Sequence, residues 1–166
     1  MYGKNYFRDM VFDDPTWDYR TMTAQQAAGI ADIKTGKTLN ATDSDLTRFR
    51  ARGGKLILYH GWSDAGMSGL ATTDYYDSVV ATLGLRETET FVRLYMAPGM
   101  QHCYGGPGPN FFGQIDVVTV APNAPQLATT MDPQHNISSA LEQWVIKGTG
   151  DTNDAANFVC AGSKEK

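Results

Sequence analysis

Two short apolar runs, with a helically spaced segment between them, dominate the pattern of hydrophobic and polar positions. Residues 55–60 read KLILYH between glycines, which predicts a buried parallel strand. Residues 71–83 place apolar side chains on one face of a helix that Gly84 would end. Residues 90–96 form a second strand-like run. The order strand, helix, strand over about 30 residues predicts a right-handed βαβ crossover.

The rest of the chain predicts helices and less regular segments around this unit. Thr23 would cap a helix over residues 23–35 that Gly36 ends. Thr42, with an acidic residue three positions later, would open a short helix that reaches Phe49. The other expected segments are an irregular aromatic arm at 1–22, a short strand or extended piece at 115–120, and a helix over 134–147 with the stripe Ile137, Ala140, Leu141, Trp144 and Val145. The predicted fold class is α/β, with two or three parallel strands flanked by helices in a single domain, residues 1–166.

Composition and charge exclude several classes of protein. The 166 residues are 42% hydrophobic and carry a net charge of −4, so the chain can fold around a core. Scattered basic residues argue against a nucleic-acid partner, and no apolar run reaches the ~18 residues of a membrane helix. The first ten residues hold no apolar stretch typical of a secretory signal. Two cysteines and three scattered histidines predict no metal site, and no cofactor is expected.

Two polar residues follow the carboxyl ends of the predicted strands: Asp64 after the first and His102 after the second. Neighbouring parallel strands lie about 4.8 Å apart and their loops converge at that edge, so the carboxylate can reach the imidazole. A carboxylate that accepts a hydrogen bond from imidazole fixes its tautomer, and the histidine can then act as general base for a hydroxyl nucleophile. His60 is interpreted as a strand histidine bonded to the backbone, and His135 as a solvent-facing residue at a helix start.

The sequences around these two residues resemble those of the tannase and feruloyl esterase family. Members of that family are secreted α/β-hydrolases that cleave esters of phenolic acids. The resemblance spans most of the chain. The segments that carry it are KLILYHGWSD (55–64), MAPGMQHC (96–103) and GGPGPN (105–110), with further similarity at 13–20, 39–55 and 148–160.

By that resemblance, Asp64 is the acid of a Ser-Asp-His triad and His102 is its base. In the family, a cysteine before the nucleophilic serine pairs with the cysteine after the catalytic histidine, which here is Cys103. The order of acid before histidine agrees with the α/β-hydrolase order Ser, Asp, His. Nearby aromatic residues could stack on a phenolic ring or simply pack in the core: Trp62, Tyr104, Phe111 and Phe112.

The sequence departs from the family pattern at the nucleophile. It contains neither the family's Cys-Ser-x-Gly-Gly segment nor a G-x-S-x-G motif, and the lid domain, which can hold calcium in family members, is also missing. The chain is therefore expected to be the C-terminal part of such a hydrolase. An apparent deletion after Lys147 removes the family partner of Cys160. Cys103 and Cys160 are then expected as free thiols, with a bond between them as the alternative.

Ser63 and Ser68 are candidates to replace the missing nucleophile, although Ser68 would equally cap the helix that follows it. The predicted function is hydrolysis of phenolic-acid esters with Asp64 and His102 in place. The alternative is a non-catalytic remnant or interaction module that keeps the fold unit. An unpaired strand edge predicts association with further copies or other chains. Family members are mostly secreted or periplasmic, and the location of this chain is left open.

Overall fold

A computed structural model describes residues 2–102, 104–108, 112–113 and 132–147. The contacts of the chain divide it into two compact units, residues 1–43 and 44–166, which are described separately below. The single domain expected from chain length stays a prediction. Within the described residues, no helix is both long and apolar enough to cross a membrane.

The first unit begins with helical segments, so the irregular arm expected over residues 1–22 is wrong for residues 2–11, whereas residues 12–18 are irregular as predicted. Helix α1 (Tyr2–Asn5) runs directly into a π-helical segment, Tyr6–Val11, and a short 3-10 turn follows at Tyr19–Thr21. Phe12 and Trp17 stack with ring centroids 5.0 Å apart. Phe12 and Trp17 lie just after the π-helical segment, so the aromatic residues pack on one another across its end, which a search for regular apolar spacing does not detect.

Helix α2 (Ala24–Ala31) begins as the sequence predicts. The Thr23 side chain accepts a hydrogen bond from the Gln26 N–H, and the Gln26 side chain accepts one from the Thr23 N–H, which completes a capping box. The predicted end at Gly36 is wrong, because Gly36 keeps right-handed helical angles (φ −54°, ψ −45°). The helix continues through a π-helical turn into α3 (Lys37–Leu39).

The second unit contains the predicted parallel strands. Strand β1 (Leu56–Gly61) pairs with β2 (Val92–Ala97) in parallel, from Leu56 opposite Val92 to Gly61 opposite Ala97. Helix α5 (Gly69–Leu83) and the short α6 (Leu85–Thr88) connect them. The strand–helix–strand unit is confirmed. Most residues of both strands are half-buried, not buried as expected for β1.

Side chains and a glycine set the helix ends in this unit. Ser68 caps α5, and Gly84 ends it with φ 85°, in the left-handed region that favours glycine. The short helix α4 (Thr47–Ala51) begins five residues later than the expected cap at Thr42, so that cap is wrong. The carboxylate of Asp45 accepts a hydrogen bond from the Thr47 N–H, which makes the later start favourable.

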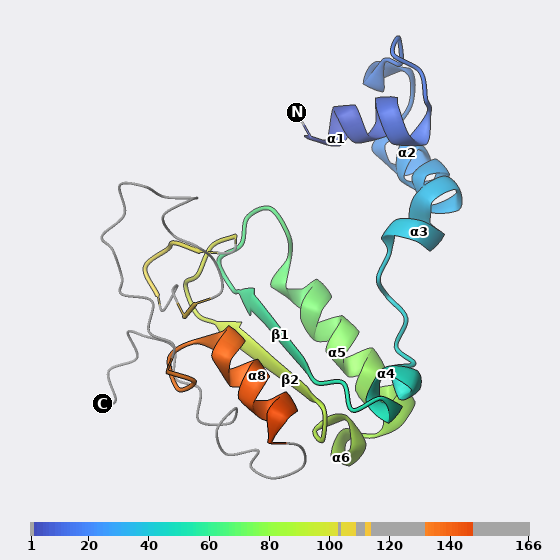
Figure 1. Cartoon of the computed structure of the whole chain (residues 1–166). Coiled ribbons are helices and arrows are strands. Elements are labelled where there is room, and N and C mark those ends of the chain that lie inside the picture. The colour runs from blue at the N-terminus through green and yellow to red at the C-terminus, as the bar shows by residue number, and fades with distance from the viewer. Residues whose placement is uncertain (1, 103, 109–111, 114–131, 148–166) are drawn as a thin grey trace. The chain divides into compact units, whose positions relative to one another are not determined.

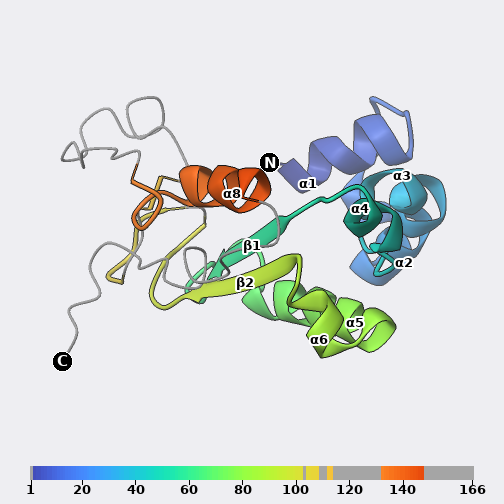
Figure 2. The same cartoon turned by 60° about the horizontal axis from the view of Figure 1, so that its bottom comes forward.

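Two helices cover opposite faces of the sheet, as Figures 1 and 2 show: α5 on one side and α8 (Ile137–Ile146) on the other. Asn136 caps α8 through a hydrogen bond from the Ser139 N–H. Val145, expected on the buried stripe of this helix, is exposed instead. The strand or extended piece expected at 115–120 lies outside the described residues. The core on the α8 side consists of Ala97, Met100, Phe112, Ile137 and Ala140, with Ile57, Tyr59 and Tyr95 packed against it.

Candidate functional site: an acid–base pair at the ends of two parallel strands

Main-chain hydrogen bonds join the two loops that leave the strands. The Trp62 N–H donates to the Ala97 carbonyl, and the Ser63 N–H donates to the Met100 carbonyl, both at 3.0 Å. Gly61 makes this approach possible, because an ideal Cβ there would lie 2.8 Å from the Gln101 carbonyl oxygen and closer still to that of Met100. The loop after β1 is therefore held directly against the loop after β2.

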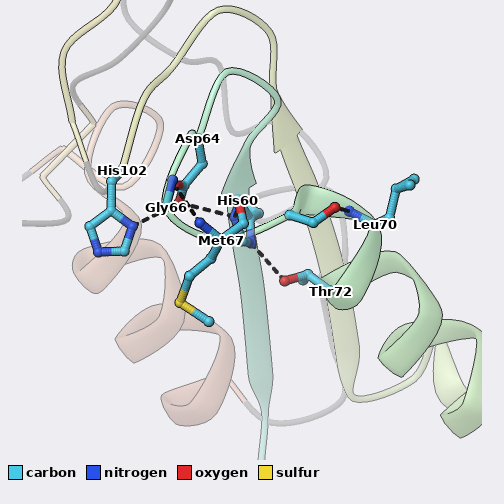
Figure 3. A network of polar contacts seen from close by, with 8 residues as sticks. His60, Asp64, Gly66, Met67, Leu70, Thr72 and His102 are labelled. Atoms are coloured by element: carbon cyan, nitrogen blue, oxygen red, sulfur yellow. Dashed lines mark hydrogen bonds and ion pairs between the residues drawn. The ribbon is translucent and has the colours of Figure 1, made fainter. Parts of the chain in front are cut away.

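Asp64 lies in the first of these loops, and the loop backbone fixes its carboxylate. Oδ1 accepts hydrogen bonds from the Gly66 N–H at 2.8 Å and the Met67 N–H at 2.9 Å. The side chain is only 4% exposed. One carboxylate oxygen is therefore satisfied by the main chain, and the other, Oδ2, faces the histidines (Figure 3).

His102 lies in the second loop and meets Asp64 as the sequence predicts. Its Nδ1 lies 2.7 Å from Asp64 Oδ2. The hydrogen bond from His102 and those from the Met67 and Gly66 N–H groups hold the pKa of the Asp64 carboxyl well below its usual range. An ionised carboxylate only accepts, so Nδ1 carries the proton and the neutral ring offers Nε2 as an acceptor. The arrangement can take a proton from a hydroxyl group placed at Nε2.

His102 borders a cavity of about 510 Å³ and is itself 62% exposed. Ser63, Gln101 and Tyr104 also line this cavity. The imidazole is therefore accessible, whereas its carboxylate partner is not.

A second histidine contacts the same carboxylate. His60 Nε2 lies 3.2 Å from Asp64 Oδ2, and also 3.2 Å from the Met67 carbonyl oxygen. Its Nδ1 lies 2.7 Å from the hydroxyl of Thr72 on α5. The expected backbone bond of His60 is present, but Asp64 and Thr72 were missed. The sequence signal that could have predicted the contact with Asp64 is its spacing of four residues from His60, with Gly61 between them.

The two candidate serines occupy different positions. The Ser68 Oγ accepts a hydrogen bond from the Leu70 N–H at 3.3 Å and so caps α5. Ser63 borders the cavity next to His102. Of the two, Ser63 is the one that shares a cavity with the base.

The aromatic candidates also differ in whether they line the cavity or pack in the core. Trp62 and Tyr104 are exposed, and Tyr104 lines the cavity. Phe112 is 2% exposed and packs edge-on against Tyr59 with ring centroids 5.3 Å apart, so core packing accounts for its position. Phe111, Cys103 and Cys160 lie outside the described residues.

The remaining histidine is paired elsewhere. His135 is solvent-facing as predicted, and its Nδ1 lies 2.7 Å from Asp132 Oδ2, where both side chains are about half exposed. Among the described residues, no cluster of three or more His, Cys, Asp or Glu side chains could hold a metal ion.

A histidine and an acid on loops at the carboxyl ends of adjacent parallel strands, with helices on both faces, define an α/β-hydrolase-type fold unit. The sequence matches the family described as tannase and feruloyl esterase over residues 2–161, so the chain belongs to that family.

Individual relatives agree with this assignment. A probable feruloyl esterase B-1 of Aspergillus oryzae is 35% identical over 149 residues, which cover 89% of this chain and 26% of the relative. A mono(2-hydroxyethyl) terephthalate hydrolase of Piscinibacter sakaiensis is 37% identical over 134 residues, 73% of this chain and 22% of the relative. The crystal structure of feruloyl esterase B from Aspergillus oryzae matches with a TM-score of 0.70 and 34% identity, covering 89% of this chain and 28% of that one. The chain thus spans about a quarter of the length of these relatives.

Proposed function

We propose that this chain carries the acid–base half of an ester hydrolase site, with His102 as general base and Asp64 as the acid that orients it. The 2.7 Å hydrogen bond between His102 Nδ1 and Asp64 Oδ2 carries the proposal. His102 Nε2 takes the proton of a serine hydroxyl as that oxygen attacks the ester carbonyl. The same proton then passes to the leaving alcohol, and water later releases the acid.

The proposed substrates are esters of phenolic acids. Relatives of this chain are named for hydrolysing feruloyl and terephthalate esters, both of which are esters of aromatic acids. The exposed side chain of Tyr104 lines the cavity that His102 borders, so it offers a surface on which an aromatic ring can stack, and the exposed Trp62 lies on the neighbouring loop after β1. Ser63 is the proposed nucleophile among the described serines, because it lines the same cavity as His102.

Release of ferulic acid from methyl ferulate, followed by chromatography, tests the proposal. We expect His102→Ala to lower the rate by at least about a hundredfold, the usual contribution of a general base. His135→Ala is the matched control, because it removes an exposed histidine with the same 2.7 Å contact to an aspartate. Equal rates for His102→Ala and the unaltered chain would refute the role of His102.

The serine variants then separate the possible nucleophiles. Loss of activity in Ser63→Ala but not in Ser68→Ala would identify Ser63, and activity retained in both would place the attacking hydroxyl outside the two candidates. The second candidate function is that of a non-catalytic remnant or interaction module, and the observation that favours it is that the Ser68 hydroxyl caps α5. A rate equal to that of buffer in the unaltered chain would refute hydrolysis through Ser63 or Ser68 and would support the second function.

A further inference from the structure

Three N–H donors form hydrogen bonds with the Asp64 carboxylate, and a fourth ring nitrogen, Nε2 of His60, lies within ion-pair distance of it. Two main-chain N–H groups occupy Oδ1. The other oxygen, Oδ2, lies 2.7 Å from His102 Nδ1 and 3.2 Å from His60 Nε2 (Figure 3). One oxygen atom is therefore shared between two imidazole rings.

The protonation of His60 follows from its partners. Both groups near Nε2, the Asp64 carboxylate and the Met67 carbonyl, can only accept a hydrogen bond, so Nε2 carries the proton. In the neutral ring Nδ1 is then an acceptor, and the Thr72 hydroxyl donates to it at 2.7 Å. Both ring nitrogens of His60 are thus engaged, and its side chain is only 14% exposed.

The two histidines on Asp64 are consequently unlike. His60 is held between strand β1, on which it lies, and helix α5, which supplies Thr72. His102 lies on a loop, and its exposed ring borders the cavity. The first ring is placed to hold the carboxylate, and the second to react.

We propose that His60 is a positioning residue: together with Thr72 it fixes Oδ2 of Asp64 so that His102 is held in the Nδ1–H form with Nε2 available. The chain of contacts runs from the Thr72 hydroxyl through His60 and Asp64 to His102. Its importance for hydrolysis rests on the catalytic role proposed for His102. Its effect on the tautomer of His102 does not depend on any reaction.

Two-bond ¹H–¹⁵N correlation spectra of the histidine rings, recorded at about pH 8.5 where unperturbed imidazole is neutral, test this inference. His102→Ala and His135→Ala assign the signals. In His60→Leu we expect the ratio of the Nδ1–H to the Nε2–H tautomer of His102 to fall several-fold, because Oδ2 loses the ring that lies 3.2 Å from it and is held by Thr72. His60→Gln, whose amide N–H can replace the Nε2 donor, should stay close to the unaltered ratio.

If the two rings compete for Oδ2 of Asp64, the tautomer ratio of His102 should change in the opposite direction. If His60 merely weakens the bond between Asp64 and His102, His60→Leu would leave the ratio unchanged or raise it, and that result overturns the inference. Should His60→Leu fail to fold, Thr72→Val decides, because it removes only the hydroxyl donor to His60. A smaller fall in the same direction supports the inference and an unchanged ratio overturns it. Thr73→Val is the matched control, because the Thr73 hydroxyl donates to the Leu70 carbonyl instead.

Kinetics separate this inference from the proposed function. If the chain hydrolyses methyl ferulate, His60→Leu should lower kcat and leave KM near its original value, because His60 does not line the cavity. If no variant hydrolyses the ester, the proposed function fails while the tautomer ratio still tests His60. If hydrolysis needs His102 but the tautomer ratio is unchanged in His60→Leu, the inference about His60 fails and the proposed function stands.

Discussion

Gly61→Ala is expected to destabilise the protein by forcing apart the two loops that carry Asp64 and His102. An ideal Cβ at this position would lie 2.7 Å from the Met100 carbonyl carbon and 2.8 Å from the Gln101 carbonyl oxygen. Carbon–oxygen contacts in proteins are about 3.3 Å or longer, so the Gln101 carbonyl must move by roughly 0.5 Å and that of Met100 by more. All of these atoms belong to the main chain, so no side-chain rotation can relieve the crowding.

The expected cost follows from two contributions. Overpacking of this kind costs about 1–3 kcal/mol. Weakening the 3.0 Å hydrogen bond from the Ser63 N–H to the Met100 carbonyl adds about 0.5–1.5 kcal/mol. Alanine has less conformational entropy than glycine in the unfolded chain, which offsets about 0.4–1 kcal/mol of this loss. We therefore expect a net loss of about 1–4 kcal/mol in the free energy of unfolding, or a fall in Tm of about 2–4 °C for each kcal/mol.

Urea denaturation followed by circular dichroism measures this loss, and Gly66→Ala is the matched control in the same loop. A Cβ on Gly66 would meet only Asp64 Oδ1, at an ordinary 3.4 Å. The unfolding midpoint of Gly66→Ala should therefore stay near that of the unaltered chain. A Gly61→Ala protein as stable as this control would refute the claim that close approach at Gly61 holds the two loops together.

Three further changes test other parts of the fold. Phe91→Ala removes a ring that is 1% exposed and should cost about 3–5 kcal/mol in urea denaturation, whereas Ile146→Ala, at 81% exposure, should stay within about 0.5 kcal/mol; similar losses for both would contradict the core assignment. Thr23→Ala removes the capping box of α2 and should cost about 0.5–2 kcal/mol, with a loss of helical ellipticity as the second readout. The pKa of Asp64 is lowered in the fold, chiefly by the hydrogen bond from His102, so this carboxylate stabilises the protein above its unfolded pKa, near 3.9, and the contribution is lost as the pH falls through the depressed folded pKa. Asp64→Asn should flatten the dependence of the urea midpoint on pH below about pH 5, and an unchanged slope would show that Asp64 is not held in this way.

Much of the second unit could be predicted from sequence because its signals are local. Two apolar runs, the first of them flanked by glycines, with a helical period between them, suffice to predict β1, α5 and β2. The juxtaposition of Asp64 and His102 then follows from topology alone, since loops at one edge of a parallel sheet converge. The errors lie where the same residues fit more than one local structure, and the omissions lie where contacts between separate segments decide.

One error and one omission illustrate these causes. Gly36 resembles a helix end in sequence, but a glycine can also keep helical angles, and here it does. His60 lies in a strand, and the alternating pattern of a strand does not predict the turn that places Asp64 next to His60. The role of His60 therefore needed the geometry of the loop and the position of Thr72 on the neighbouring helix.

The acid–base pair is a property of the strand–helix–strand unit itself. Its carboxylate is held by main-chain N–H groups of its own loop, and that loop is bonded through main-chain atoms to the loop that carries His102. All of these contacts lie within residues 61–102, so every group that holds the pair belongs to this stretch of the chain. The pair fixes where a proton can be taken up, at Nε2 of His102. It does not supply the attacking oxygen, so the unit can keep this geometry whether or not it catalyses a reaction. The rate of the unaltered chain compared with that of buffer distinguishes the two cases, and Ser63→Ala then tests the nucleophile.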